Sequence, residues 1–255
     1  MSGAAAAEPD FTEDRLLGGR VRLRQPARGY RVAIDPIFLA ASVPAEPHEL
    51  VLDIGCGAGA AMLCLAARVP HSRVVGLEMQ RDLVRLASDN TILNGVEARV
   101  SVMIGDLLRA PPRLSPGTFD HVMANPPYHG RGSTSPAAAP GKTDATIEGD
   151  ADLAAWVRFA LTMVRPKGTV TMIHRADRID ALLAEFAGRA GEIVVFPLWP
   201  GAGKPASRIL VQARKQSAAP ARLAAGLVLH GPDGRLTAAA DGVLREGRAV
   251  DFGPP

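Results

Sequence analysis

The sequence predicts an α/β fold built on a doubly wound, mostly parallel sheet of seven strands. From residue 49 onward, short apolar runs alternate with segments of helical periodicity, which is the order of a parallel sheet covered by helices. A glycine-rich turn follows the first apolar run, and the last two apolar runs have no helix between them. These observations favour a Rossmann-like sheet that ends in an antiparallel C-terminal hairpin.

Each element of this core is predicted from its periodicity and from the residues that end it. Five short runs are the expected parallel strands, over residues 50–54, 73–78, 98–104, 119–124 and 168–174. Four longer segments are the expected helices, over residues 58–68, 82–93, 153–164 and 179–190. The two strands of the C-terminal hairpin are expected at residues 193–199 and 208–213.

Outside this core, the composition divides the chain into further parts. Residues 1–10 are an Ala-rich tip that we expect to be disordered. Residues 11–48 are predicted to form an N-terminal extension with a hairpin and a short helix, in front of a core at residues 49–215. Residues 216–255 form a C-terminal extension in which residues 227–229 are a predicted short strand.

Composition limits the classes of protein that the chain can belong to. Its 255 residues, 47% of them hydrophobic, are enough to bury a full core, and a net charge of +3 permits a polyanionic partner without requiring one. Two cysteines, Cys56 and Cys64, cannot supply a disulfide framework or a four-ligand zinc site. We therefore expect a reduced, cytoplasmic protein with no metal, no membrane contact and no signal peptide.

A glycine-rich turn joins the first predicted strand to the first predicted helix. It follows Asp53 and contains Gly55, Gly57 and Gly59, which allow a tight turn and a close approach of the backbone to a ligand. The unpaired N–H groups of the following helix lie at the same place. This pattern predicts a site for a nucleotide-type cofactor, although its spacing also fits a dinucleotide fingerprint.

Two carboxylates end the next two predicted strands. Glu78 lies at the end of residues 73–78, where a carboxylate can accept hydrogen bonds from both hydroxyls of a cofactor ribose. Asp106 follows residues 98–104, where it can accept from an adenine amine or cap a turn. Both residues are therefore predicted to bind the cofactor.

The tetrapeptide Asn125-Pro126-Pro127-Tyr128 ends the fourth predicted strand, in the crevice where open sheets bind ligands. The two prolines have no N–H group, so the backbone offers carbonyl oxygens only, and Asn125 adds a side-chain acceptor. Tyr128 provides an aromatic face for a planar substrate. We predict that these four residues are the catalytic notch, which suits a group with two N–H bonds.

In order and spacing, the glycine-rich turn, Glu78, Asp106 and the tetrapeptide resemble class I N-methyltransferases over residues 50–215. The resemblance implies S-adenosyl-L-methionine as the cofactor and a planar amine or amide nitrogen as the target. Outer segments resemble the bacterial family that methylates an adenine in the anticodon loop of valine tRNA: residues 14–19, 25–26, 29–31, 35–41, 229–230 and 244–245. This second resemblance implies RNA, and in particular tRNA, as the partner.

Basic residues near the N-terminus are consistent with such a partner. Six arginines and no acidic residue lie between Arg15 and Arg31, and Arg22 and Arg24 would share one face of a strand. His129 follows the tetrapeptide directly and opens a long irregular segment, residues 129–150, that we expect to close over the substrate. Arg22, Arg24, Arg31 and His129 are therefore predicted RNA contacts; a solvated basic face is the alternative.

Two other functions remain open from the sequence. Enzymes that methylate a glutamine of release factors also carry the tetrapeptide, but they have a long helical domain before the glycine-rich turn. Here 52 residues precede Asp53, and residues 21–24 alternate like a strand, which counts against that alternative. A non-catalytic adaptor that binds the cofactor or RNA has no use for an acceptor notch, and a nicotinamide enzyme would need a hydride-transfer site that we do not find.

Overall fold

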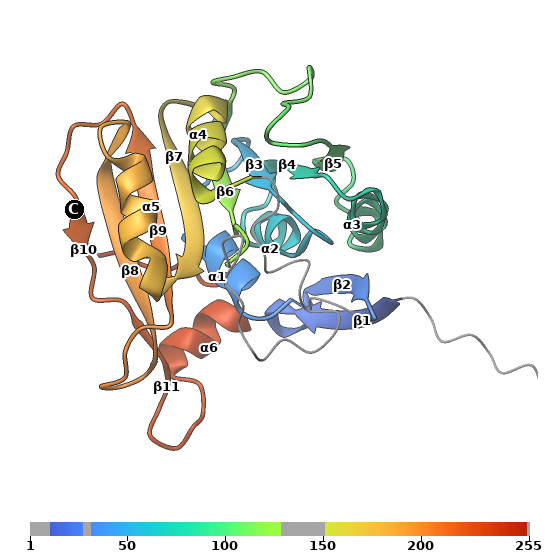
Figure 1. The fold of residues 1–255 in the computed structure, drawn as a ribbon. Coiled ribbons are helices and arrows are strands. Elements are labelled where there is room, and N and C mark those ends of the chain that lie inside the picture. The colour runs from blue at the N-terminus through green and yellow to red at the C-terminus, as the bar shows by residue number, and fades with distance from the viewer. Residues whose placement is uncertain (1–10, 28–31, 129–150, 254–255) are drawn as a thin grey trace, which may run out of the picture.

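The computed structural model describes residues 11–27, 32–128 and 151–253 (Figure 1). In this part of the chain a large sheet has the strand order β10-β8-β9-β7-β6-β3-β4-β5, and β11 also pairs with β8. Five strands run parallel as predicted: β3 (Leu50–Ile54), β4 (Arg73–Glu78), β5 (Val100–Ile104), β6 (Phe119–Ala124) and β7 (Val164–Arg175). The antiparallel pair β8 (Ala190–Gly201) and β9 (Arg208–Lys215) confirms the C-terminal hairpin.

Helices cover both faces of the sheet, and each face has its own apolar core (Figure 1). On one face lie α1 (Asp35–Ser42), α2 (Ala60–Arg68), α3 (Arg81–Leu93) and α6 (Ala238–Leu244). On the other lie α4 (Leu153–Met163) and α5 (Ile179–Phe186). Successive strand residues such as Val51 and Leu52 enter opposite cores, because side chains alternate along a strand. The doubly wound architecture is thereby confirmed.

The sheet is larger than the seven strands that the sequence predicts, because the C-terminal extension adds two. Strand β10 (Arg222–Leu223) and strand β11 (Leu227–His230) both pair in parallel with β8. They cover the outer edge of a 12-residue strand whose backbone groups would otherwise be unpaired. Residues 227–229 are a strand as expected, but segments this short carry too little periodicity to reveal their partner.

The N-terminal hairpin forms a small sheet of its own and docks on α3. Strands β1 (Phe11–Leu16) and β2 (Val21–Pro26) are antiparallel, and the short turn η1 (Leu17–Gly19) joins them. Two asparagines of α3 hydrogen-bond to the backbone of β2. The fully buried Asn90 accepts from Arg24 N at 2.9 Å and donates to Arg24 O at 2.8 Å, and the exposed pair between Asn94 and Arg22 repeats this pattern.

Asn90 also connects the hairpin to the glycine-rich turn. Its Nδ2 donates a second hydrogen bond, of 2.9 Å, to the carbonyl oxygen of Ala58. One buried amide therefore holds the hairpin, helix α3 and the turn together, which places the hairpin beside the predicted cofactor site.

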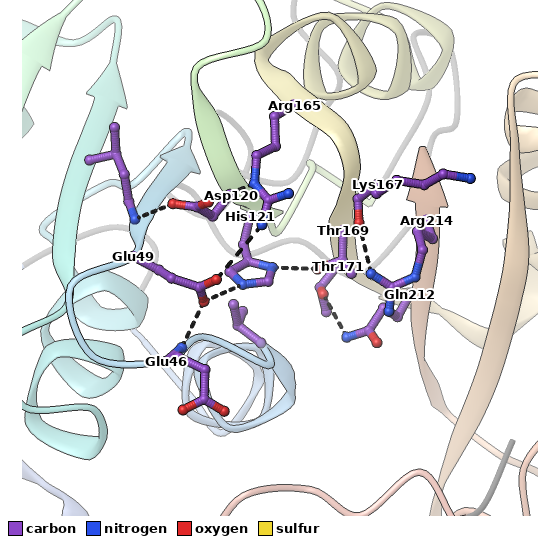
Figure 2. Close-up of polar contacts among 12 residues, drawn as sticks. Glu46, Glu49, Asp120, His121, Arg165, Lys167, Thr169, Thr171, Gln212 and Arg214 are labelled. Carbon is purple, nitrogen blue, oxygen red and sulfur yellow. Dashed lines mark hydrogen bonds and ion pairs between the residues drawn. The ribbon is translucent and has the colours of Figure 1, made fainter. Parts of the chain in front are cut away.

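A polar network holds the amino ends of β3, β6 and β7 together (Figure 2). His121 lies within 2.9 Å of Glu49 Oε2 and 2.7 Å of Thr169 Oγ1, and burial lowers its pKa. Asp120 accepts from Leu50 N at 2.8 Å and from Arg165 Nε at 2.6 Å. Glu49 directly precedes β3, and Asp120 and His121 lie in the first half of β6. The network therefore lies at the opposite edge of the sheet from the predicted site.

Candidate active site

The sheet topology brings the predicted site residues to one edge. Strands β6, β3, β4 and β5 are parallel neighbours in this order, and their carboxyl ends lie within one residue of the same register. Asn125, Gly55, Glu78 and Asp106 lie at or within two residues of their carboxyl ends. After β3 the chain continues to β4 and β5 on one side of β3, and it then returns to β6 on the other side. The site therefore lies at the topological switch point where open sheets bind ligands.

The glycine-rich turn leaves space for a ligand at Gly57 and none at Gly55. Both residues have positive φ, 66° at Gly55 and 56° at Gly57, and Gly59 has a φ of 94° at the N-cap of α2. A Cβ on Gly55 would lie 2.5 Å from the Trp156 ring of α4, whereas a Cβ on Gly57 would meet no atom within 4 Å. The missing side chain at Gly55 thus lets Trp156 pack against the turn, whereas the backbone at Gly57 faces open space.

Glu78 shapes this turn from the neighbouring strand. Its Oε2 accepts from the Gly57 N–H at 3.0 Å, and its Oε1 accepts from the Gln80 N–H at 2.9 Å. Each carboxylate oxygen can accept more than one hydrogen bond. The side chain is therefore fixed in position and still has lone pairs for the hydroxyls of a ribose.

Asp53 contributes a buried carboxyl group just before the turn. Its side chain is 2% exposed, and its Oδ2 has no hydrogen-bond partner among the described residues. Burial raises the pKa of Asp53 to about 8, a backbone hydrogen bond from Met62 opposes this, and the nearby charge of Glu78 adds to it. A buried oxygen without a partner fits a site that a polar ligand completes.

Asp106 caps a turn, which is one of the two roles that the sequence predicts for it. Its Oδ1 accepts from the Leu108 N–H at 2.9 Å, and its carbonyl oxygen accepts from the Arg109 N–H at 3.0 Å. The side chain therefore caps a tight turn after β5. A contact with an adenine amine stays a prediction.

The catalytic notch follows β6 without a break. Asn125, Pro127 and Tyr128 are half-buried and Pro126 is buried. The Tyr128 hydroxyl lies 2.9 Å from Asn125 Oδ1 and also hydrogen-bonds to Asp35 Oδ2. The side-chain acceptor of the notch and its aromatic residue are thus in direct contact.

Three residues that sequence analysis does not assign to the site surround Tyr128. The Arg208 guanidinium carbon lies 4.7 Å from the Tyr128 ring centroid, and Arg208 Nε donates to Asp35 Oδ2 at 3.0 Å. The ring of His174, which is fully buried, lies 5.5 Å from the Tyr128 ring, edge-on at 79°. Burial, together with Arg178, lowers the pKa of His174 to about 4. These residues come from α1, β9 and β7, so no local motif reveals them.

The predicted basic face of the hairpin is partly neutralised. Glu13 of β1 pairs with both arginines, at 2.8 Å from Arg22 Nε and 3.4 Å from Arg24 Nε. Hydrogen bonding to Arg22 holds the pKa of Glu13 below its usual range. The hairpin register places Glu13 opposite Arg24. Glu13 lies before residues 15–31, so the count of charges over that segment does not include it. Arg31, His129 and residues 129–150 lie outside the described residues.

No metal site or membrane span is found in the part of the chain that the structure describes. Within residues 11–27, 32–128 and 151–253, no three His, Cys, Asp or Glu residues are grouped as metal ligands. Within the same ranges, no helix has the length and apolar character needed to cross a bilayer.

Known proteins similar to this chain are methyltransferases. The family model "Methyltransferase small domain" matches residues 33–141. An rRNA N(6)-adenosine-methyltransferase of Caenorhabditis elegans is 26% identical over 64% of this chain and 69% of its own length. A tRNA1(Val) (adenine(37)-N6)-methyltransferase of Tolumonas auensis is 28% identical over 60% of this chain and 63% of its own. A release factor glutamine methyltransferase of Geobacter sulfurreducens is 40% identical over 32% of this chain and 28% of its own length.

A solved structure of a predicted methyltransferase has a similar fold. A protein of Agrobacterium tumefaciens described as a predicted O-methyltransferase is 26% identical and superposes with a TM-score of 0.72, over 85% of this chain and 98% of its own. The family match, this likeness and the glycine-rich turn at the switch point agree. The chain is an S-adenosylmethionine-dependent methyltransferase, and its residues 33–141 are similar to the methyltransferase small domain.

Proposed function

We propose that this enzyme methylates the exocyclic amine of an adenine in RNA, and that the RNA is a tRNA methylated in its anticodon loop. The observation that carries the proposal is the acceptor notch from Asn125 to Tyr128, next to the glycine-rich turn on the parallel sheet. Relatives named for adenine-N6 methylation align over 60–64% of the chain, which supports adenine as the target.

The notch addresses the weak nucleophilicity of the target nitrogen. The lone pair of an exocyclic amine is delocalised into the ring, and accepting both of its protons favours a pyramidal nitrogen with a localised lone pair. Asn125 Oδ1 and the Pro126 carbonyl oxygen would accept these two protons. Acceptors fixed before the reaction would stabilise the positive charge as it develops on nitrogen. No strong base is required, because the proton can leave after the transfer.

The cofactor would lie along the ends of β3, β4 and β5. When bound, it supplies an electrophilic methyl group on a sulfonium. Glu78 would accept from the ribose hydroxyls, and Gly57 would let the backbone approach closely. Asp53 and Asp106 would add acceptors, and the orphaned Asp53 Oδ2 fits a polar ligand.

Glutamine methylation is the second candidate, because an amide also offers two N–H bonds to such a notch. The release factor relative aligns over 32% of the chain, about half of the share covered by the adenine-N6 relatives. In addition, an arginine-containing hairpin docks beside the site through Asn90. These two observations favour RNA.

The substrate is tested by methyl transfer from labelled S-adenosylmethionine to three separate acceptors. These are an unmodified tRNA1(Val) transcript, an rRNA fragment and a purified release factor. We expect label in the tRNA and none in the release factor. Label in the release factor alone would contradict the RNA assignment, and no transfer to any acceptor would favour a non-catalytic adaptor.

Replacing Glu78 with alanine should weaken binding of S-adenosylhomocysteine by about 10- to 100-fold, because a carboxylate that accepts charge-assisted hydrogen bonds is lost. The ligand-induced rise in melting temperature should shrink accordingly. Glu192→Ala, at an ion pair with Arg214 on the hairpin β8–β9, is the control and should keep the full shift. Stabilisation of the wild type by NAD and not by S-adenosylhomocysteine would refute this assignment.

The double change Arg22→Ala and Arg24→Ala should weaken tRNA binding and reduce the slope of log K against log salt by about 1.5–2, since roughly two phosphate contacts are lost. Because Glu13 neutralises part of this face, Glu13→Gln should have the opposite effect and tighten binding at low salt. Filter binding over a salt series measures both. Unchanged RNA affinity in all variants would show that the arginines of the hairpin face solvent and do not contact RNA.

A further inference from the structure

The Tyr128 hydroxyl has more acceptors than protons. Asp35 Oδ2 and Asn125 Oδ1 both lie within hydrogen-bond distance of the Tyr128 oxygen. A phenolic hydroxyl has a single proton, so it can donate to only one of them at a time. The acceptor that receives this proton has one lone pair fewer for another donor, and the other acceptor keeps both of its lone pairs.

The surroundings of Asp35 favour the carboxylate as the acceptor of this proton. Hydrogen bonds to an ionised acceptor are shorter and stronger than those to a neutral amide. Asp35 begins α1, is buried, and receives a 3.0 Å ion-pair hydrogen bond from Arg208 Nε. Burial keeps water from competing for the hydroxyl, and Arg208 fixes the orientation of the carboxylate. The Tyr128 proton is therefore directed away from Asn125.

Without this arrangement, Tyr128 would compete with the substrate for the Asn125 oxygen. If Asp35 did not accept the hydroxyl proton, Tyr128 would donate to Asn125 Oδ1, the atom assigned to the substrate amine. With the proton on the Asp35 side, the hydroxyl oxygen can only accept. It can then receive an N–H from the Asn125 amide after a half-turn of that amide, which directs the amide oxygen away from Tyr128.

We infer that Asp35 and Arg208 are positioning residues that capture the Tyr128 hydroxyl and thereby keep the Asn125 oxygen open for a substrate N–H group. The inference rests on the proposed role of the notch in methyl transfer. Arg208 acts twice, since it holds Asp35 and lies over the Tyr128 ring. The substrate class that results is an N–H donor, because a substrate with acceptors only would gain nothing from the free oxygen.

The test is a double-mutant cycle between Asp35 and Tyr128. Asp35→Asn keeps the shape but makes the two acceptors of the hydroxyl equally neutral, so kcat on an unmodified tRNA1(Val) transcript should fall by about 10-fold. Tyr128→Phe removes the competing donor and sets the reference rate for a notch without a hydroxyl. In the Tyr128→Phe variant, adding Asp35→Asn should change kcat by less than about twofold. Affinity for S-adenosylhomocysteine should stay the same in the Asp35→Asn variant.

Asp241→Asn is the matched control, because it removes the same charge from an Arg–Asp pair on α6, away from Tyr128. It should leave kcat unchanged. If Asp35 were merely structural, Asp35→Asn would lower kcat equally with and without the hydroxyl, and that result would overturn the inference. A wild type that is inactive on the transcript would instead contradict the proposed RNA substrate.

A second measurement needs no substrate. The 13Cζ resonance of Tyr128, assigned by its loss in Tyr128→Phe, reports hydrogen bonding of the hydroxyl. We expect it to move in Asp35→Asn and to stay in place in Asp241→Asn. A resonance that does not respond to Asp35→Asn would show that the hydroxyl does not donate to Asp35, and would overturn the inference whatever the enzyme methylates.

Discussion

Replacing Asn125 with alanine should lower kcat by about 10²–10³-fold, the loss typical of removing one preorganised donor or acceptor from a site of developing charge. The contact strengthens as the nitrogen becomes positive, so it acts mainly in the transition state and affects kcat more than substrate binding. Single-turnover methyl transfer to an unmodified tRNA transcript measures the effect. The affinity for S-adenosylhomocysteine should stay close to that of the wild type.

Asn125→Asp serves as the matched variant for this prediction. It keeps an oxygen acceptor at the same position, so it should retain more activity than the alanine variant. Near-normal turnover by Asn125→Ala would contradict the proposed role of the notch. Equal losses in the alanine and aspartate variants would show that the amide group, rather than its oxygen, is required.

The second large effect is expected on stability, at the amide that joins the hairpin to the core. Replacing Asn90 with alanine should lower the free energy of unfolding by about 2–4 kcal/mol, because three buried or partly buried backbone groups lose their hydrogen-bond partner at once. These groups are the N–H and carbonyl of Arg24 and the carbonyl of Ala58. Urea unfolding with an unchanged m-value measures the loss.

Asn94→Ala is the natural control, because Asn94 makes the same pair of hydrogen bonds with Arg22 at an exposed position. Water can replace it there, so the expected loss is only about 0.5–1 kcal/mol. Equal losses for the two variants would show that burial of Asn90 does not decide its contribution. The Asn90 variant should also bind S-adenosylhomocysteine less tightly, since Ala58 belongs to the glycine-rich turn.

Much of the fold follows from local pattern. Strands β3 and β6 begin and end at the predicted residues, because an apolar run bounded by glycine, proline or polar residues is a strong signal for a buried parallel strand. The pairing of β10 and β11 with β8 could not be predicted, since two to four residues fix neither register nor partner. Their place depends on an edge strand that forms elsewhere in the chain.

The residues of the candidate site also fall into two groups: those that a local motif predicts, and those that meet only in the folded chain. Motifs predict Gly55, Glu78 and Asn125 as site residues, and the sheet order places the strand ends that carry them side by side. Asp35 and Arg208 could not be found, because they are 173 positions apart and meet only when α1 packs beside β9. The pairing of Glu13 with the arginines was missed for a related reason, since it depends on hairpin register.

The most direct test of the central claim is to identify the methylated atom. The wild-type enzyme is incubated with 13C-methyl-labelled S-adenosylmethionine and an unmodified tRNA1(Val) transcript, and the digested nucleosides are separated and weighed by mass spectrometry. We expect the label in N6-methyladenosine, and we expect the Asn125→Ala variant to form this nucleoside about 10²–10³-fold more slowly. Label on a base carbon or a ring nitrogen would contradict the account, because the notch is built for an exocyclic amine.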